Sequence, residues 1–175
     1  HRDARVSPRI APQMIGLGLI EAIPAGDILA GADPDDIDGD GISGRANKVF
    51  SLEHERLLLG RFGHKGISPT IRQQTAVALA NDMGVSTTLV ANGGEQPEIT
   101  ETIFDFIAGY SAQIGVPARA EITDRTVMRG KELFYQAGCV ACHRPKFVTH
   151  ILPMRPEPSN QLIWPYSDFL LHDMG

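Results

Sequence analysis

The sequence is short of cysteine, tryptophan and long apolar runs, and these shortages limit what the protein can be. Two cysteines in 175 residues cannot form a disulfide framework, and a chain of this length can bury a core without one. No run of apolar residues is long enough to span a bilayer. A formal net charge of −5 argues against a general nucleic-acid binder.

The remaining composition is that of an ordinary globular protein, and the length fits one domain or parts of two. The chain begins at His1 without a start methionine and ends at Gly175. We interpret it as an excised or mature segment. The absence of a signal peptide therefore carries no information about the compartment.

Residue patterning predicts a mainly α chain with one small β-hairpin. Helices are expected over five stretches: 10–23, 24–30, 69–83, 98–112 and 124–137. Residues 47–63 alternate weakly between apolar and polar side chains, which indicates the hairpin. Ser68 and Pro69 are typical of a helix N-cap and first helical position, and Gly84 of a helix end.

Both cysteines belong to one motif, Cys139-Val-Ala-Cys142-His143. Two thiols separated by two residues can add to the two vinyl groups on one edge of a porphyrin, and the histidine that follows can bind the iron. The motif therefore predicts covalent haem c, with Cys139 and Cys142 as the thioether residues and His143 as the proximal iron ligand.

Three other uses of the cysteines are weaker. A thioredoxin-like pair needs a βαβ context, which does not precede Cys139. A zinc site could add His143 and His150, but adjacent ligands at 142 and 143 fit a tetrahedron poorly. A plain disulfide leaves His143 without a role.

The order of elements around the motif is that of a small cytochrome c domain: a helix, the CxxCH turn and a trailing loop. A change of composition near residue 90 predicts a boundary there. We expect residues 91–175 to form a cytochrome c-like haem domain that is cut at its C-terminus. Residues 1–90 would be the remainder of an adjoining cytochrome domain.

The stretch DPDDIDGDGISGR predicts a second site, because Asp36, Asp38 and Asp40 alternate ahead of a glycine bend. Carboxylates in this pattern suit Ca²⁺. The loop is not an EF-hand, since the twelfth position counted from Asp36 is Asn47 instead of glutamate. The alternative is a solvated turn capped by its own side chains.

A haem iron bound by one histidine can take a ligand on its other face, and we predict that this ligand is Met174 in LLHDMG. The aromatic and leucine residues before it can pack on a porphyrin. His172 and Met154 are the rival ligands. Met128 is interpreted as a core residue of its helix, and Met83 as a ligand of a haem in the first domain.

Six stretches of the chain together resemble the di-haem oxidoreductases related to bacterial di-haem cytochrome c peroxidases. They are RIAPQMIGLGLIEAIP, DPDDIDGDGISGR, LGRFGHKG, QQTAVALANDMG, GKELFYQAGCVACHRP and PYSDFLLHDMG. The resemblance covers nearly the whole chain, which looks like the middle of a family member. One departure is His64, where the family usually has tryptophan; Trp164 is the chain's single tryptophan.

The resemblance implies haem-dependent electron transfer within a peroxidase-like, periplasmic oxidoreductase. The electron partner would be a redox protein or the second haem domain of the same parent chain. A calcium ion near the interface between haem domains is also implied. The alternatives are a simple electron carrier without a catalytic site, and a non-haem module that binds zinc or calcium. The catalytic residues and the substrate stay unassigned.

The haem assignment predicts that both thiols are needed for full attachment. We expect Cys139→Ala or Cys142→Ala to weaken or abolish covalent haem, measured by the visible spectrum after acid-acetone extraction of protein made in an oxidising compartment. Undiminished covalent haem in the double variant would contradict the assignment.

Overall fold

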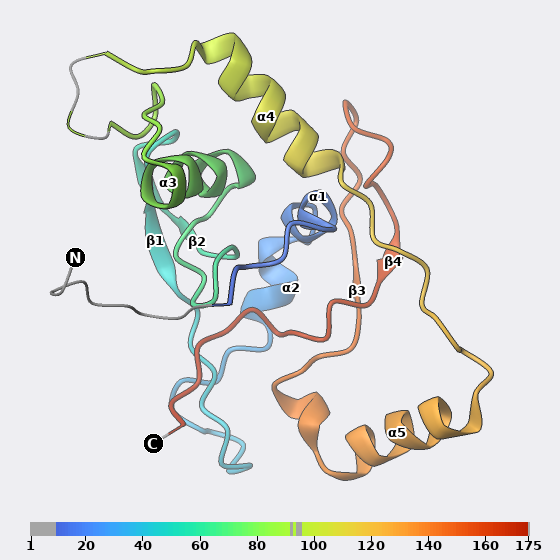
Figure 1. Ribbon diagram of the computed structural model, residues 1–175. Helices are drawn as coiled ribbons and strands as arrows, with labels where there is room; N and C mark the ends of the chain where they lie inside the picture. The colour runs from blue at the N-terminus through green and yellow to red at the C-terminus, as the bar shows by residue number, and fades with distance from the viewer. Residues whose placement is uncertain (1–9, 92, 94–95, 175) are drawn as a thin grey trace, which may run out of the picture.

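The computed structural model describes residues 10–91, 93 and 96–174; residues 1–9, which begin the predicted 1–90 domain, lie outside this range. Five α-helices and two two-stranded antiparallel sheets make up the described chain (Figure 1). The helices are α1 (Leu17–Glu21), α2 (Ala25–Leu29), α3 (Ile71–Met83), α4 (Glu101–Gln113) and α5 (Arg125–Gln136). The strands are β1 (Lys48–Ser51), β2 (Arg56–Leu59), β3 (Phe147–Val148) and β4 (Leu162–Ile163). The mainly helical character and the predicted hairpin are confirmed, whereas the β3–β4 pair was not predicted.

The first predicted helix, 10–23, is much shorter in the structure. Gly16 precedes α1 with a φ of +71°, a conformation that favours glycine, and α1 then covers only five residues. A Cβ built on Gly18 would lie 2.1 Å from the carbonyl oxygen of Ala112. These glycines therefore let α1 pack directly against the end of α4, at the cost of helix length.

The predicted start of α3 is wrong by two residues. Ser68 is not the N-cap, because its backbone pairs with that of Phe62 in both directions and stays extended. The cap is Thr70, whose side chain accepts a hydrogen bond from the Gln73 amide at 3.1 Å. Gly84, with a φ of +72°, ends the helix as predicted.

Three apolar clusters form the core. One joins Ile23 and Ile28 with Phe147 and Ile163, so side chains from both sides of residue 90 pack together. The second gathers Leu17, Phe62 and Ile71, and the third Ala76, Leu79 and Phe104. Since α1 and the ends of both strand pairs share these clusters, the early and late parts of the chain are held to each other.

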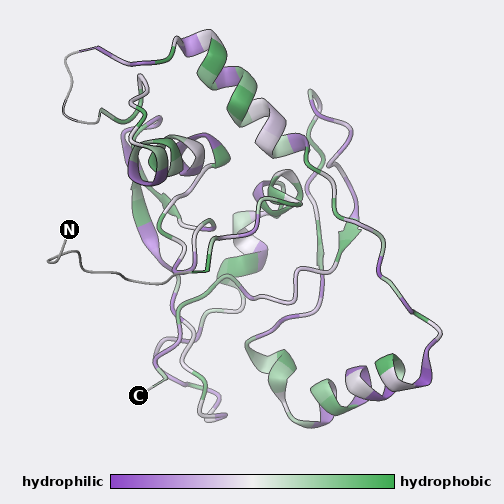
Figure 2. Ribbon diagram, in the orientation of Figure 1, coloured by the Kyte–Doolittle hydropathy of each residue, from purple (hydrophilic) through white to green (hydrophobic). Residues whose placement is uncertain are grey.

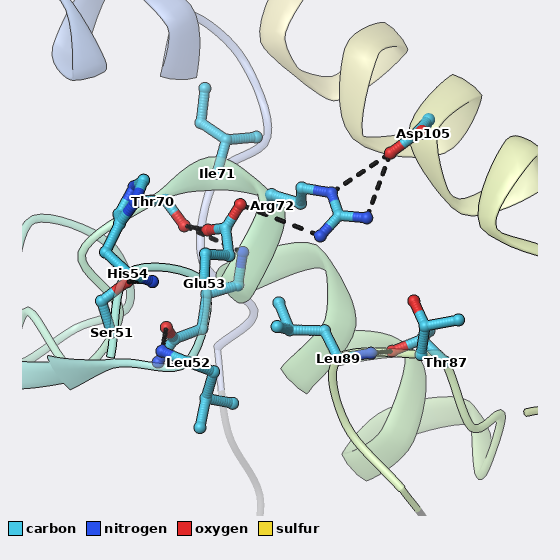
Figure 3. Close-up of polar contacts among 12 residues, drawn as sticks. Ser51, Leu52, Glu53, His54, Thr70, Ile71, Arg72, Thr87, Leu89 and Asp105 are labelled. Atoms are coloured by element: carbon cyan, nitrogen blue, oxygen red, sulfur yellow. Dashed lines mark hydrogen bonds and ion pairs between the residues drawn. The ribbon is translucent and has the colours of Figure 1, made fainter. Parts of the chain in front are cut away.

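Arg72 ties the hairpin to two helices. Its guanidinium lies 3.9 Å from a Glu53 carboxylate oxygen and 3.1 Å from one of Asp105, as Figure 3 shows, and it also pairs with Glu101. The same group stacks over the Phe104 ring, 4.4 Å from its centroid. Arg72 thus fixes the β1–β2 turn, α3 and α4 in one arrangement.

The apolar stripe predicted for α4 faces solvent in part. Phe104, Ala108 and Ser111 are its buried residues, while the side chains of Phe106 and Tyr110 are exposed. Figure 2 shows apolar and polar residues interspersed along both α4 and α5. The described chain contains no helix long and apolar enough to cross a membrane.

Helix α5 and the turn after it are joined to the rest of the molecule by two long extended segments (Figure 1). The helix predicted over 124–137 is confirmed as α5, and Asp124 caps it by accepting hydrogen bonds from the amides of Thr126 and Val127. However, no residue of α5 is buried: Met128, which was expected in the core, is 42% exposed, and Leu133 is 48% exposed. The helix therefore has an apolar side that no described protein segment covers.

Arg61 supports the C-terminal end of α1. Its guanidinium donates to the carbonyl oxygens of Ile20 at 3.0 Å, Glu21 at 3.3 Å and Ile23 at 2.5 Å. Burial lowers the pKa of Arg61, and the Glu21 carboxylate opposes that effect. These carbonyls lie at or just beyond the C-terminal end of α1, and that of Ile20 also accepts from the Ile23 amide at 3.2 Å, so the arginine adds donors to a helix end inside the fold.

We predict that Arg61→Ala lowers the free energy of unfolding by about 2–4 kcal/mol, because part-buried carbonyls lose their donor. Urea titration followed by circular dichroism measures the change. Arg56→Ala, on the exposed strand β2, is the control and should change stability by no more than about 0.5 kcal/mol. Equal effects of the two substitutions would contradict this role.

Candidate functional site

The CxxCH motif forms one compact turn directly after α5. Gly138, with a φ of +76°, turns the chain, and Cys139–Ala141 make a short 3₁₀ helix. The amides of Cys142 and His143 both donate to the Cys139 carbonyl, the latter at 2.9 Å. Both thiols are free and partly exposed. The local sequence therefore presents two thiols and an imidazole from five consecutive residues.

The imidazole of His143 is oriented by a segment that follows it in sequence. Its Nδ1 lies 3.0 Å from the carbonyl oxygen of Tyr166. A carbonyl only accepts, so Nδ1 carries the proton and Nε2 keeps its lone pair for a metal. Phe134 of α5 packs beside the ring, with centroids 6.0 Å apart, and meets the Tyr166 ring edge to face.

Residues 166–172, which we call the strap, lie against the turn. The Asp168 amide donates to the Cys142 carbonyl at 3.1 Å. Tyr166 and Phe169 have φ values of +51° and +60°, which side chains other than glycine rarely adopt. Leu171 pairs with Arg45 through backbone hydrogen bonds in both directions. The first half of the chain thus anchors the strap.

His172 lies between a carboxylate and a thiol. Its Nε2 is 2.7 Å from an Asp168 carboxylate oxygen, and its Nδ1 is 3.8 Å from the Cys142 sulfur. The side chains of His172 and Asp168 are mostly buried. Desolvation raises the pKa of the Cys142 thiol, and the charges of Asp168 and Asp40 add to the effect. At neutral pH the group is therefore a thiol.

The predicted iron ligands on the far face differ in their surroundings. Met174 stands two residues beyond His172 with its side chain largely exposed. Met154 is also exposed and lines a groove with Glu21 and Arg155, which do not belong to the CxxCH turn. Glu21 itself is held by the Ile71 amide at 2.9 Å and the Arg155 guanidinium at 3.4 Å.

The residues present fit a covalent haem. Two free thiols, an imidazole whose Nε2 is available, and an α5 with uncovered apolar side chains meet at one turn. A zinc site is less well supported. Within the described residues, Cys139, Cys142, His143 and His150 are not gathered as a set of metal ligands.

The acidic loop does gather carboxylates, although not the predicted three. Asp33, Asp36 and Asp38 bring one oxygen each within 4.8 Å of one another, whereas Asp40 is not in the group. The Asp40 carboxylate instead accepts from the Ile42 amide at 2.8 Å. Asp33 was missed because it precedes the alternating pattern, although it opens the Asp-Pro-Asp-Asp run.

Hydrogen bonds inside the loop explain its shape. One Asp33 oxygen accepts from the Ile37 and Asp38 amides, and Asp36 accepts from the Gly41 amide at 3.0 Å. The other Asp33 oxygen is buried and has no hydrogen-bond partner. These hydrogen bonds are those of a turn capped by its own side chains. One carboxylate oxygen of Asp33 is left without a partner and could bind a further ligand.

Arg61 and His64, in the LGRFGHKG stretch, make hydrogen bonds within the fold. Arg61 is engaged by carbonyls of the α1 end, and the Nε2 of His64 lies 2.7 Å from the Ile10 carbonyl.

Sequence reasoning did not find Tyr166 and Asp168 as supports of the site. The only signal was their place in the PYSDFLLHDMG stretch, which was interpreted for its methionine, its histidine and the packing of its aromatic and leucine residues on a porphyrin.

Comparison with models of protein families identifies a family that matches this chain. A family model described as "Di-haem oxidoreductase, putative peroxidase" matches residues 1–94 and 87–175. The two matches together extend over the whole chain. No curated protein and no solved structure matches the chain.

Proposed function

The chain belongs to the di-haem oxidoreductase family, and from this premise we propose that its Cys139–His143 turn carries a covalent c-type haem for electron transfer. The parent protein would be a peroxidase-like oxidoreductase. The observation that carries the proposal is the hydrogen bond from His143 Nδ1 to the Tyr166 carbonyl, which leaves Nε2 free beside two thiols.

Each residue of the turn has a defined part in this proposal. Cys139 and Cys142 hold the porphyrin edge as thioethers, and His143 binds the iron. The haem supplies one-electron redox chemistry. The Tyr166 carbonyl fixes the imidazole orientation and increases its basicity, which favours the oxidised iron. The uncovered apolar residues of α5 would exclude water from the bound ring.

Met174 is proposed as the ligand on the other face of the iron. His172, the rival in the same stretch, has both ring nitrogens engaged, by Asp168 and by the Cys142 sulfur. The exposed Met174 thioether has no comparable restraint on its position in the structure, and two residues of chain separate it from Leu171. Met154 stays the other alternative.

The electron partner is proposed to be a redox protein or a second haem domain of the parent chain, and the location periplasmic. The family description, which names two haems, supports the partner. Covalent attachment through CxxCH, made in an oxidising compartment, supports the location.

A simple electron carrier is the second candidate, and one observation favours it. Glu21 is a carboxylate that could act as an acid or base in peroxide cleavage, but in the structure it is bound by Arg155 and the Ile71 amide. Both of its carboxylate oxygens are therefore engaged in contacts within the fold.

Peroxide separates the two candidates. The haem-loaded full-length parent is reduced, mixed with hydrogen peroxide, and followed in the visible spectrum and by peroxide consumption. Catalytic turnover with a reducing co-substrate supports the oxidoreductase, whereas reversible electron transfer without turnover indicates the carrier. A protein without covalent haem after expression with attachment machinery would overturn both.

Met174→Ala is expected to abolish a methionine-to-iron charge-transfer band and to lower the reduction potential, because loss of methionine removes a ligand that raises it. Absorption in the far red and potentiometric titration measure these changes. If Met174→Ala keeps the band, Met174 is not the ligand. Loss of the band in Met154→Ala would then assign the ligand to Met154, and a changed spectrum in His172→Ala would assign it to His172.

We also propose that the acidic loop holds Ca²⁺, through Asp33, Asp36 and Asp38 and with Asp40 as an outer charge. The close carboxylate oxygens and the unpaired buried oxygen of Asp33 support this. The ion would offset the mutual repulsion of carboxylates packed within one short loop.

Calcium should therefore raise the melting temperature, and a chelator should lower it. The stabilisation follows ligand linkage, about 2.7 kcal/mol at a hundredfold excess of Ca²⁺ over Kd. Asp33→Asn should reduce the response more than Asp35→Asn, an exposed neighbour outside the group. An unchanged melt and no heat of calcium binding would remove the site.

A further inference from the structure

Cys142, His172 and Asp168 form a chain of side-chain contacts. It connects the proposed haem-attachment thiol to two residues that lie 26 and 30 positions further along the sequence. Asp168 accepts the Nε2 proton of His172 at 2.7 Å, which leaves the Nδ1 lone pair facing the Cys142 sulfur at 3.8 Å. The thiol proton can therefore point toward an acceptor that is already oriented. This arrangement fixes the direction of the sulfur.

His172 has little freedom to leave this position. A Cβ on Gly44 would lie 3.2 Å from the His172 ring and 2.8 Å from Leu170, so the backbone of the first half closes against the strap. Leu171, the preceding residue, is paired with Arg45. The Asp168 amide also binds the Cys142 carbonyl, so backbone and side chain of one residue act on the same cysteine.

The two cysteines differ in this respect. Among the described residues, the Cys139 thiol has no hydrogen bond like that of Cys142. Cys139 begins the 3₁₀ turn next to the end of α5, whereas Cys142 lies under the strap. One sulfur is thus held by side chains and the other only by the local backbone.

We infer that His172, held by Asp168, is a positioning residue that directs the Cys142 sulfur for thioether formation. The inference rests on the proposed covalent haem. In the bond-forming step the S–H adds across the C=C bond of a vinyl group. An S–C bond forms, the S–H bond breaks, and the hydrogen ends on the other vinyl carbon. No external oxidant or reductant is consumed.

This role accounts for the engagement of both His172 nitrogens, which an iron ligand would not show. It also gives the strained strap a purpose, because the left-handed residues Tyr166 and Phe169 lie on either side of Asp168, which binds the Cys142 carbonyl through its amide and His172 through its carboxylate. Orientation of a reacting atom is a recognised source of rate, and small misplacements are costly.

Single-cysteine backgrounds test the inference on the full 175-residue chain. Haem-free protein with reduced thiols is mixed anaerobically with dithionite-reduced haem b. Covalent attachment is followed by intact mass and by the pyridine haemochrome band. In the Cys139→Ala background, where only Cys142 can react, His172→Ala should slow attachment about tenfold. His172→Asn, which can keep an acceptor near the Nδ1 position, should restore much of the rate.

The Cys142→Ala background is the matched control, because only Cys139 can react and His172→Ala should leave its rate unchanged. His150→Ala, at an exposed histidine, should change neither rate. Circular dichroism and non-covalent haem binding verify that each variant folds. Equal slowing in both cysteine backgrounds, or no slowing in either, overturns the inference. A parent chain that forms no thioether at all instead refutes the proposed haem attachment.

Discussion

The burial of Phe147 and Ile163 against Ile23 and Ile28 is the contact on which the site depends. Each such side chain contributes roughly 1.5–3 kcal/mol when fully buried. Through this cluster, the segment that follows the CxxCH turn packs against α2. A hydrogen bond of 3.0 Å from the Arg144 guanidinium to the Asp27 carbonyl also holds this segment against α2. Only with the segment so held can the strap lie over the turn.

The positions of the site residues are therefore fixed mainly by the segment that follows the CxxCH turn. Helix α5, although it directly precedes the motif, contributes little buried contact to the fold. A twelve-residue helix without buried residues is marginal on its own, despite the Asp124 cap. Its apolar residues gain a packing partner if a porphyrin binds the turn. Binding and the ordering of α5 would then be thermodynamically linked, since a ligand of the folded form stabilises that form.

Local features of the sequence were predictable, and contacts between distant residues were not. The CxxCH turn, the helix that begins near Asp124 and the hairpin at 47–63 follow from neighbouring residues. The Ser68 cap was wrong because pairing with Phe62 overrides a local preference. Likewise, a residue-by-residue pattern gives no sign that Tyr166 contacts His143, or that Asp33 completes the acidic group in place of Asp40.

The separation between His143 and the carbonyl that orients it has a consequence for the order of biogenesis. Tyr166 lies 23 residues after His143, and the strap is anchored to Arg45 from the other half. A chain emerging from the ribosome or a translocon presents its two thiols well before these supports exist. Attachment that uses His172 and Asp168 to direct Cys142 therefore has to wait until residues 166–172 have been made and have folded over the turn.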